Sequence, residues 1–392
     1  MKELARSITG QKGSSIRKMF NMAQGMEDVI SFGLGEPGFS TPEHIGKAAC
    51  EAIERGETHY TVNAGIPALR EALSRKMEEK KGVKYDPAKE IIVTSGGVEA
   101  LFLTFKALLN PGDEIIVGTP AFPNYFGQIA LCDAKLVMVP LKEEDNFCYN
   151  VENIRKAITD KTKAILINSP SNPIGSVTGE EILRELAGLC VEKDLYLMTD
   201  EVYQEFTYGE TPYFSIATCP GMKERTLIID SFSKTYAMTG WRCGFVLGPE
   251  AVISEMVKMQ ESVVSCVNTP TQYAAIAALE GPQDVLQTML AQYDENRKLV
   301  LKEINSIEGL SLKMAAGAFY AFVNITKTGM TSEEFAVALL QKAHVVVVPG
   351  SGFGEGGEGY VRISYVSSKE DTAEGLRRMR KFMEELMKNK EA

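Results

Sequence analysis

The residues best suited to chemistry in this chain are grouped around Lys234. Ser231 and Ser233 precede it closely, and Arg242 follows it. Hydroxyl groups and a guanidinium fork can bind phosphate oxygens. A lysine beside a cationic group and partly shielded from water has a lowered pKa and can attack an aldehyde. A lone lysine is usually a solvated surface charge, but this grouping indicates a nucleophilic lysine next to a phosphate site.

A second anion-binding element is predicted at residues 94–101, where T-S-G-G-V-E-A-L leaves a strand and opens a helix. The N-terminus of a helix is a ready-made site for an anion. The backbone N–H groups of Gly97 and Val98 are the expected donors. A Gly-Gly turn is weak evidence by itself, but together with Arg242 and the two serines it completes a predicted phosphate cup.

Three other residues, Asp200, Asn172 and Arg362, have ordinary structural roles open to them when they are considered on their own. Asp200 follows an apolar strand, where a buried carboxylate is costly unless it meets a positive partner, and helix capping is the alternative role. Asn172 precedes a proline, a place that asparagine favours in turns anyway. Arg362 stands in an alternating stretch at residues 360–365. It could face either a site or solvent, and the alternation alone cannot decide between them.

These residues need a framework, and the chain predicts one of alternating strands and helices. Most of the apolar, β-rich runs are separated by segments of helical periodicity. Such alternation is typical of an α/β fold with a largely parallel sheet covered on both faces. The predicted strands are residues 91–94, 114–117, 136–139, 164–167, 195–198 and 226–229.

Two helices carry recognisable start signals. Residues 178–181, T-G-E-E, predict a capping box for a helix with an apolar stripe. A C-terminal helix is predicted to begin at Ser368, with Asp371 at the reciprocal capping position. Its predicted apolar face consists of Leu376, Met379, Met383 and Leu386.

Composition excludes several classes of function. The chain has 392 residues, with 42 basic against 52 acidic residues and a net charge of −10. A broad nucleic-acid-binding face is therefore not expected. The apolar runs are too short to cross a membrane, and the N-terminal residues lack a signal-peptide core. The cysteines are scattered singly, so no metal site is expected. We expect a cytoplasmic protein.

The motif S-x-S-K-x-x-x-M-T-G-W-R-x-G at residues 231–244 resembles the cofactor-lysine motif of the class I aminotransferases of pyridoxal-5′-phosphate (PLP) fold type I. Residues 35–39, 60–70, 168–175, 200–203 and 360–364 resemble other blocks of that family in the same order. The pattern is closest to the branch with bacterial and archaeal aspartate and aromatic aminotransferases. The resemblance implies the fold type I architecture, a large domain at residues 43–281 and a small α+β domain from residues 1–42 and 282–392.

The resemblance also implies roles in cofactor binding. Lys234 would hold PLP as a Schiff base, and Asp200 would pair with the protonated pyridine nitrogen. Asn172 and Tyr203 would hydrogen-bond the phenolic oxygen of the ring. Phe122 would lie flat on the ring. The predicted phosphate contacts are Gly97, Val98, Ser231, Ser233, Arg242 and, across the interface of a homodimer, Tyr60.

For the substrate, Arg362 resembles the arginine that grips the α-carboxylate, and Gly35 and Asn172 are further predicted contacts. Lys234, Asp200 and Tyr203 are the predicted catalytic residues. The implied activity is transfer of an amino group from an L-amino acid, aspartate or an aromatic or apolar one, to a 2-oxo acid such as 2-oxoglutarate.

Specificity depends more on physical reasoning than on the resemblance. A second carboxylate in the pocket would need a partner, yet Val98 stands where some relatives place a lysine, and residues 262–272 contain no basic side chain. The pocket is therefore predicted to be permissive. Polar groups, water or a basic residue of the N-terminal segment, such as Lys12, Arg17 or Lys18, would accommodate a diacid.

Other readings remain open at this point. A PLP-dependent C–S lyase or another eliminating enzyme could use the same lysine and ring. A non-catalytic PLP or amino-acid sensor would need a DNA-binding module, and no helix-turn-helix segment fits before Ile30. A nicotinamide-binding domain would need a G-x-G-x-x-G after an early strand, which the sequence lacks.

Overall fold

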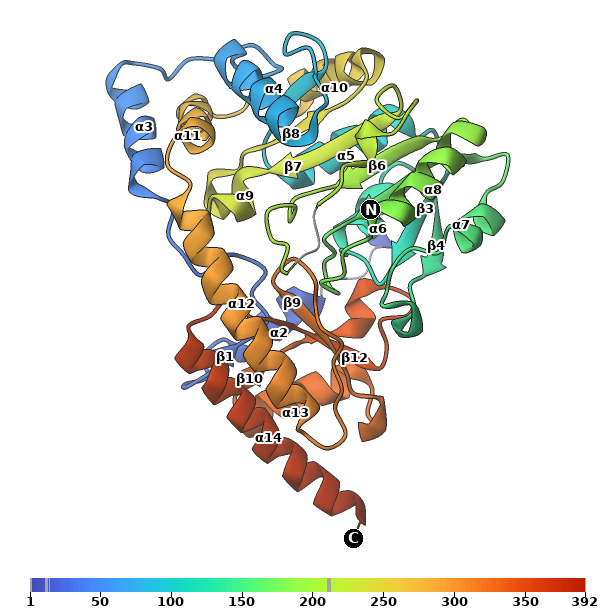
Figure 1. Cartoon of the computed structure of the whole chain (residues 1–392), viewed down its shortest axis with the longest axis vertical. Helices are drawn as coiled ribbons and strands as arrows, with labels where there is room; N and C mark the ends of the chain where they lie inside the picture. Colours follow the sequence, from blue (N-terminus) through green and yellow to red (C-terminus); the bar gives the residue numbers. More distant parts are fainter. Residues whose placement is uncertain (1, 11–12, 14, 210–212, 392) are drawn as a thin grey trace.

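The computed structural model describes residues 2–10, 13, 15–209 and 213–391. A seven-stranded sheet with its helices forms one part of the molecule, and a three-stranded sheet with its helices forms the other. The long helix α12 (Asp284–Asn305) runs from the first part into the second (Figure 1). The functional residues come from both parts.

The seven-stranded sheet has the order β2-β8-β7-β6-β5-β3-β4. Neighbouring strands from β7 to β4 run parallel, whereas β8 is antiparallel to both of its neighbours. The predicted, largely parallel sheet is therefore confirmed. In sheet order the strands are β2 (Ile91–Thr94), β8 (Gly244–Leu247), β7 (Thr226–Ser231), β6 (Tyr196–Asp200), β5 (Thr162–Asn168), β3 (Glu114–Thr119) and β4 (Lys135–Pro140).

Alternate side chains of each strand enter cores on opposite faces of the sheet, as the pleat requires. In β3, Ile115 and Val117 pack with α5, α6 and α10, whereas Ile116 packs with α7 and α8. The β2 and β8 end of the second face is covered by α3, α4 and α11. The helices are α3 (Glu43–Glu54), α4 (Pro67–Lys81), α5 (Gly97–Leu108), α6 (Asn124–Ala130), α7 (Val151–Ala157), α8 (Glu180–Glu192), α10 (Glu250–Val263) and α11 (Thr269–Glu280).

The carboxyl ends of the central strands deliver polar side chains to one edge of the sheet. Asn168 ends β5, Asp200 ends β6 and Ser231 ends β7. Asn168 and Asp200 are direct partners in the sheet register. The short helix α9 (Phe232–Thr235) follows β7 at once and carries Lys234. Ligands bind at this edge in open α/β sheets.

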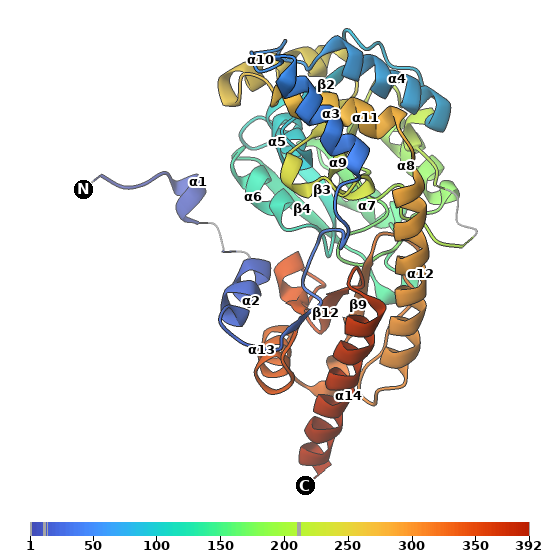
Figure 2. The same cartoon turned by 90° about the vertical axis from the view of Figure 1, so that its left-hand side faces the viewer.

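The second part is built from both ends of the chain. Its antiparallel sheet has the order β11-β12-β9, and β1 pairs in parallel with β10. Figure 2 shows α12 beside α14, and the short helix α1 (Arg6–Thr9) standing apart from both parts. The other elements of the second part are α2 (Ser15–Ala23), β1 (Ile30–Ser31), β9 (Tyr320–Asn324), α13 (Ser332–Ala343), β10 (Val345–Val346), β11 (Val348–Pro349), β12 (Tyr360–Ser364) and α14 (Lys369–Glu391).

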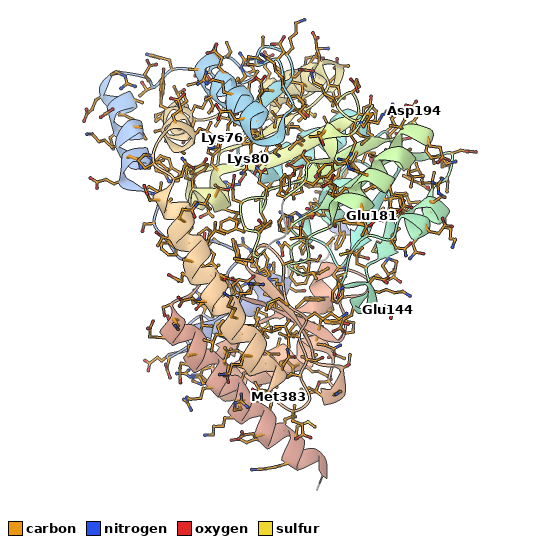
Figure 3. The ribbon with its side chains drawn as sticks, viewed as in Figure 1. Lys76, Lys80, Glu144, Glu181, Asp194 and Met383 are labelled. Carbon is orange, nitrogen blue, oxygen red and sulfur yellow. The ribbon has the colours of Figure 1, made fainter. Side chains whose placement is uncertain are left out.

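One of the two helix-start predictions is wrong. The N-cap of α8 is Gly179, which has no side chain to accept a hydrogen bond, so Thr178 lies one residue before the cap. The N–H of Thr178 bonds the Ser169 hydroxyl at 2.9 Å and is therefore not available to Glu181, as a capping box would require. The start of α14 is confirmed, since the Ser368 hydroxyl accepts from the Asp371 N–H at 3.0 Å. The face of α14 that carries Met383 (Figure 3) packs into the core of this part.

Among the helices of the described residues, none is both long enough and apolar enough to cross a bilayer.

Candidate active site

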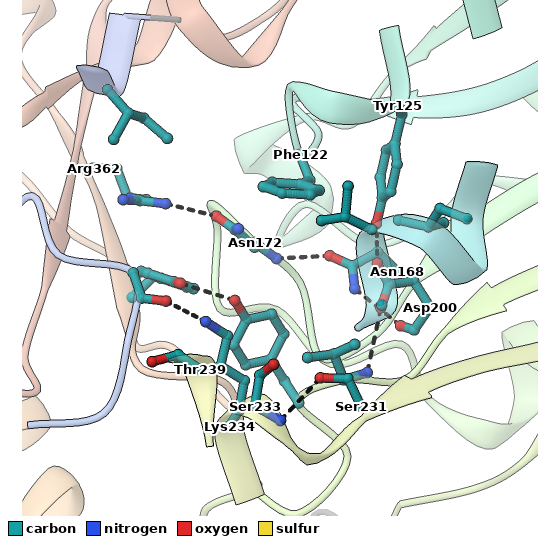
Figure 4. A pocket seen from close by; sticks show the side chains of 18 of the residues that line it. Phe122, Tyr125, Asn168, Asn172, Asp200, Ser231, Ser233, Lys234, Thr239 and Arg362 are labelled. Carbon is teal, nitrogen blue, oxygen red and sulfur yellow. Dashed lines mark hydrogen bonds between the residues drawn. The ribbon is translucent and has the colours of Figure 1, made fainter. Parts of the chain in front are cut away.

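A cavity of about 210 Å³ lies between the carboxyl edge of the large sheet and the β9–β12 pair. Its walls bring together nearly every residue that the sequence singled out (Figure 4). The predicted residues that line it are Gly35, Gly97, Val98, Phe122, Asn172, Asp200, Tyr203, Ser231, Ser233, Lys234, Arg242 and Arg362.

Lys234 reaches the cavity from α9, whose N-cap is Ser231. The Ser231 hydroxyl accepts from the Ser233 N–H at 3.0 Å and so fixes the start of this short helix. The Lys234 ammonium donates to the carbonyl oxygen of Gly35. Burial lowers the pKa of Lys234 to about 8, and the nearby carboxylate of Glu36 only partly opposes this shift. A lysine in this state supplies the neutral amine that nucleophilic attack needs.

Next to Lys234, the first turn of α5 offers N–H groups that an α-helix leaves without internal acceptors, those of Gly97 and Val98. Gly96 precedes them with φ +84°, and the Arg242 guanidinium lies where a Cβ on Gly96 would stand. A Cβ on Gly244 would approach the Gly97 nitrogen to 2.7 Å, so glycine is required there as well. The close backbone approach, the two serine hydroxyls and Arg242 together form a cup for an anion.

Asp200 is a buried carboxylate that points into the cavity (Figure 4). It accepts hydrogen bonds from the Tyr125 hydroxyl at 2.5 Å and from the Val202 N–H at 3.3 Å. Within the part of the chain that the structure describes, it forms no ion pair. Burial raises the pKa of Asp200 to about 6, against the opposing effect of the Tyr125 hydrogen bond. A cationic group placed beside it would restore the carboxylate.

Asn172 and Tyr203 line the wall between Asp200 and Arg362. The Asn172 N–H donates to Oδ1 of Asn168 at 2.8 Å, which ties this turn to the end of β5. The Tyr203 hydroxyl is hydrogen-bonded to the Tyr320 hydroxyl at 2.8 Å. Burial raises the pKa of Tyr203 well above its ordinary value, so this phenol stays protonated.

Arg362 is buried in β12, with 1% of its surface exposed. Its Nη1 donates to Oδ1 of Asn172 and its Nη2 to the carbonyl oxygen of Gly33, both at 2.9 Å. Its Nε has no hydrogen-bond partner, and no carboxylate among the described residues pairs with the guanidinium. Because a buried unpaired charge is costly, a carboxylate ligand would be a suitable partner for this guanidinium.

Comparison with known proteins decides the family. The chain matches the family Aminotransferase class I and II over residues 27–379. It belongs to this family of aminotransferases.

Two relatives and one solved structure show how closely the chain follows the family. It is 46% identical to the aspartate aminotransferase of Pyrococcus abyssi, over 95% of this chain and 96% of the relative. It is 43% identical to an aromatic-amino-acid aminotransferase of Thermococcus litoralis, again over 95% of this chain and 96% of the relative. The crystal structure of an aromatic aminotransferase from Pyrococcus horikoshii superposes with a TM-score of 0.90 at 44% identity, covering 94% of this chain and 99% of that one.

The protein is accordingly a PLP-dependent aminotransferase. The cavity has a counterpart for each polar group of PLP. The cup at α5 suits the phosphate. The buried carboxylate of Asp200, which forms no ion pair with any described residue, suits a protonated ring nitrogen. The phenol of Tyr203 suits the ring oxygen, and the Lys234 amine suits the aldehyde. The residues present therefore fit the cofactor of the family.

Of two predicted cofactor contacts of this aminotransferase, Phe122 and Tyr60, only Phe122 lies at the cavity in the single chain. Phe122 lines the cavity, with its ring edge-on to that of Tyr125 at 5.5 Å between centroids. Tyr60 is 89% exposed and does not line the cavity. Its predicted phosphate contact requires a second chain and stays a prediction.

Sequence reasoning missed several residues of the aminotransferase cavity. Asn168 and Tyr125 both hydrogen-bond Asp200, through its carbonyl oxygen and its carboxylate respectively. Tyr320 bonds Tyr203. The place of Asn168 at the end of a predicted strand, beside Asp200 on the next one, was a usable signal. The others depend on contacts between distant segments. The additional lining residues are Ile16, Leu101, Tyr125, Asn168, Val202, Thr239 and Tyr320.

Proposed function

We propose that this aminotransferase moves the amino group of aspartate, or of an aromatic or other apolar L-amino acid, to a 2-oxo acid such as 2-oxoglutarate. The observation that carries the proposal is the buried guanidinium of Arg362, which pairs with no carboxylate of the described residues and lies in the same cavity as the Lys234 amine. A ligand with a carboxylate next to an amino or oxo group would satisfy both. The names of the relatives, aspartate and aromatic-amino-acid aminotransferases, support the same range of donors.

PLP, when bound, supplies an aldehyde that accepts the amino group and a ring that withdraws electrons from the substrate Cα. The residues of the chain orient the substrate beside the cofactor and hold or move the protons of the reaction. Arg362 holds the α-carboxylate, which directs the Cα–H bond toward Lys234. The Lys234 amine then takes the proton from Cα. Asp200 keeps a ring nitrogen protonated, while Tyr203 and Asn172 offer hydrogen bonds to the ring oxygen.

The remaining walls of the cavity favour a permissive pocket. Ile16, Leu101 and Phe122 are apolar, and Val98 stands where a lysine could have bound a second carboxylate. Besides Lys234, Arg242 and Arg362, the described lining residues include no further basic side chain.

The basic residues proposed for a diacid lie elsewhere. Arg17 and Lys18 are exposed and do not line the cavity, and Lys18 pairs with Glu333. Lys12 lies outside the described residues. The hydroxyl of Thr239 already donates to the Glu36 carboxylate at 2.7 Å, so we propose that water meets a second carboxylate.

A panel of amino-acid donors with 2-oxoglutarate as acceptor tests this proposal. We expect kcat/KM for phenylalanine or tyrosine within a thousandfold of that for aspartate. A preference for aspartate above about a thousandfold, ~4 kcal/mol of discrimination, would reveal a dedicated carboxylate clamp and contradict the permissive pocket.

We also propose a homodimer with composite sites and a division into residues 43–281 and residues 1–42 with 282–392. The exposed Tyr60 supports the dimer, since its family role needs a partner chain. Light scattering of the active enzyme tests the homodimer, and an active monomer would refute that assembly.

A further inference from the structure

Tyr320 joins two functions of the cavity that the sequence assigned to separate residues. It begins β9 and is fully buried, with 0% of its surface exposed. Its hydroxyl is hydrogen-bonded to that of Tyr203, and its ring lies under the Arg362 guanidinium, 4.4 Å from ring centroid to Cζ. Strand alternation explains this placement, because Tyr320 and Arg362 lie on the same face of neighbouring strands.

The ring of Tyr320 stabilises Arg362 without competing for it. The π face of the ring attracts the guanidinium that lies over it. The N–H groups in the plane of the guanidinium therefore remain available to acceptors. Nη1 and Nη2 already bond Asn172 and Gly33, and Nε bonds no acceptor in the part of the chain that the structure describes. Tyr320 therefore holds the guanidinium in place for a carboxylate while supplying no carboxylate of its own.

The hydroxyl of Tyr320 affects Tyr203 in a different way. Each phenol has a single hydrogen to donate, and either oxygen can be the donor in their shared bond. If Tyr203 is to donate to a ligand in the cavity, its oxygen must accept from Tyr320. Burial raises the pKa of both phenols, so both hydrogens are retained. Donation by Tyr320 would also polarise the Tyr203 hydroxyl and make it a stronger donor.

We propose that Tyr320 is a positioning residue with two separable roles: its hydroxyl directs the hydrogen of Tyr203 toward the ring oxygen of the cofactor, and its ring holds Arg362 for the substrate carboxylate. This inference rests on the proposed function of the site. The two roles can be separated because Tyr320→Phe removes only the hydroxyl, whereas Tyr320→Leu removes the ring as well.

The experiment compares both variants with the wild type and with a matched control. The control is Tyr208→Phe, a buried tyrosine of the same core whose hydroxyl donates to the Ala318 carbonyl at 2.7 Å and which does not line the cavity. The visible absorbance of each PLP-loaded protein is followed as the pH is varied, which gives the pKa of the Schiff base between Lys234 and PLP, here called the spectroscopic pKa. Binding of 3-phenylpropionate, an unreactive carboxylate, is measured separately, along with kcat and KM.

For Tyr320→Phe we expect the spectroscopic pKa to rise by about half a unit and kcat to fall about 3- to 10-fold, the effect of one hydrogen bond. Binding of 3-phenylpropionate should change less than about twofold. For Tyr320→Leu we expect the same changes in the spectroscopic pKa and kcat. In addition, binding of 3-phenylpropionate should weaken at least about tenfold. Tyr208→Phe should match the wild type in the spectroscopic pKa and in ligand binding.

An unchanged spectroscopic pKa in Tyr320→Phe, in an enzyme whose wild type transaminates, would overturn the role of the hydroxyl. Equal binding of 3-phenylpropionate by the Phe and Leu variants would overturn the role of the ring. A folded, PLP-loaded wild type without transamination would instead contradict the proposed function, and the inference with it.

Discussion

The Lys234 ammonium donates a hydrogen bond to the carbonyl oxygen of Gly35. This bond joins α9, at the edge of the large sheet, to the N-terminal segment that also supplies the Gly33 carbonyl bonded by Arg362. The amine that would hold the cofactor and the arginine that would hold the substrate therefore share one backbone segment.

Replacing Lys234 with alanine should abolish covalent attachment of PLP. The variant removes the amine that attacks the aldehyde while the anion cup at α5 stays in place, so PLP should still bind, but reversibly. Borohydride reduction followed by peptide mass mapping measures this. A label that persists on another lysine of the variant would show that the assignment of Lys234 is wrong.

Replacing Asp200 with alanine should leave PLP bound but lower kcat by roughly 100- to 1000-fold, the usual effect of losing one preorganised electrostatic group. The carboxylate acts mainly when negative charge develops on the substrate Cα, so KM should change little. Steady-state kinetics of the loaded enzyme measure the change. Turnover near that of the wild type would rule out this role.

The attachment of PLP to the cofactor-free protein should depend on pH through Lys234. Burial lowers the pKa of its ammonium to about 8, so the neutral, attacking amine predominates above that pH. The rate of attachment should therefore rise with pH, with a midpoint near 8, and then level off. Stopped-flow absorbance between about pH 6 and pH 10 measures the profile. A rate that is still rising steeply at pH 10, as the ordinary lysine pKa of about 10.4 would give, would contradict the burial of the free amine.

A buried ion pair involves Glu201, the residue that follows Asp200 in the sequence. Lys81, at the end of α4, pairs with Glu201, and each side chain is 1% exposed. Lys81→Met would leave the carboxylate buried without its cation, close to the buried Asp230. We expect the free energy of unfolding to fall by about 3–5 kcal/mol.

A matched control for Lys81→Met is Arg75→Met, which breaks the exposed pair between Arg75 and Glu280. That change should cost less than about 1 kcal/mol. Urea unfolding of the holoenzyme measures both variants. Equal losses in the two would mean that the buried pair contributes no more than a surface one.

The sequence predicts those features that depend on local pattern. Strands such as β2 and β7 are short apolar runs between turn residues, so they can be recognised without their neighbours. Strand β8 was missed because it follows the lysine motif directly and pairs antiparallel in a mostly parallel sheet. Thr178 fits a capping pattern, but its N–H bonds Ser169 across a turn, a contact that spacing alone does not reveal.

The same limit applies to the site. The motif located Lys234, the serines and Arg242, and the resemblance supplied Asp200 and Arg362. Tyr125 and Tyr320 were missed because each acts on a residue far away in the chain, Asp200 and Tyr203 respectively. Such contacts are fixed by the packing of whole strands and helices, and no local spacing encodes them.

The most direct test of the central claim follows the nitrogen atom itself. The PLP-loaded enzyme is supplied with ¹⁵N-labelled aspartate or phenylalanine and unlabelled 2-oxoglutarate, and the products are analysed by mass spectrometry. We predict that the label appears in glutamate, together with the oxo acid of the donor, and that Lys234→Ala gives none. Label released as free ammonia would contradict an aminotransferase and would favour an eliminating enzyme. No transfer of label from any amino acid of the panel would contradict an aminotransferase of this specificity.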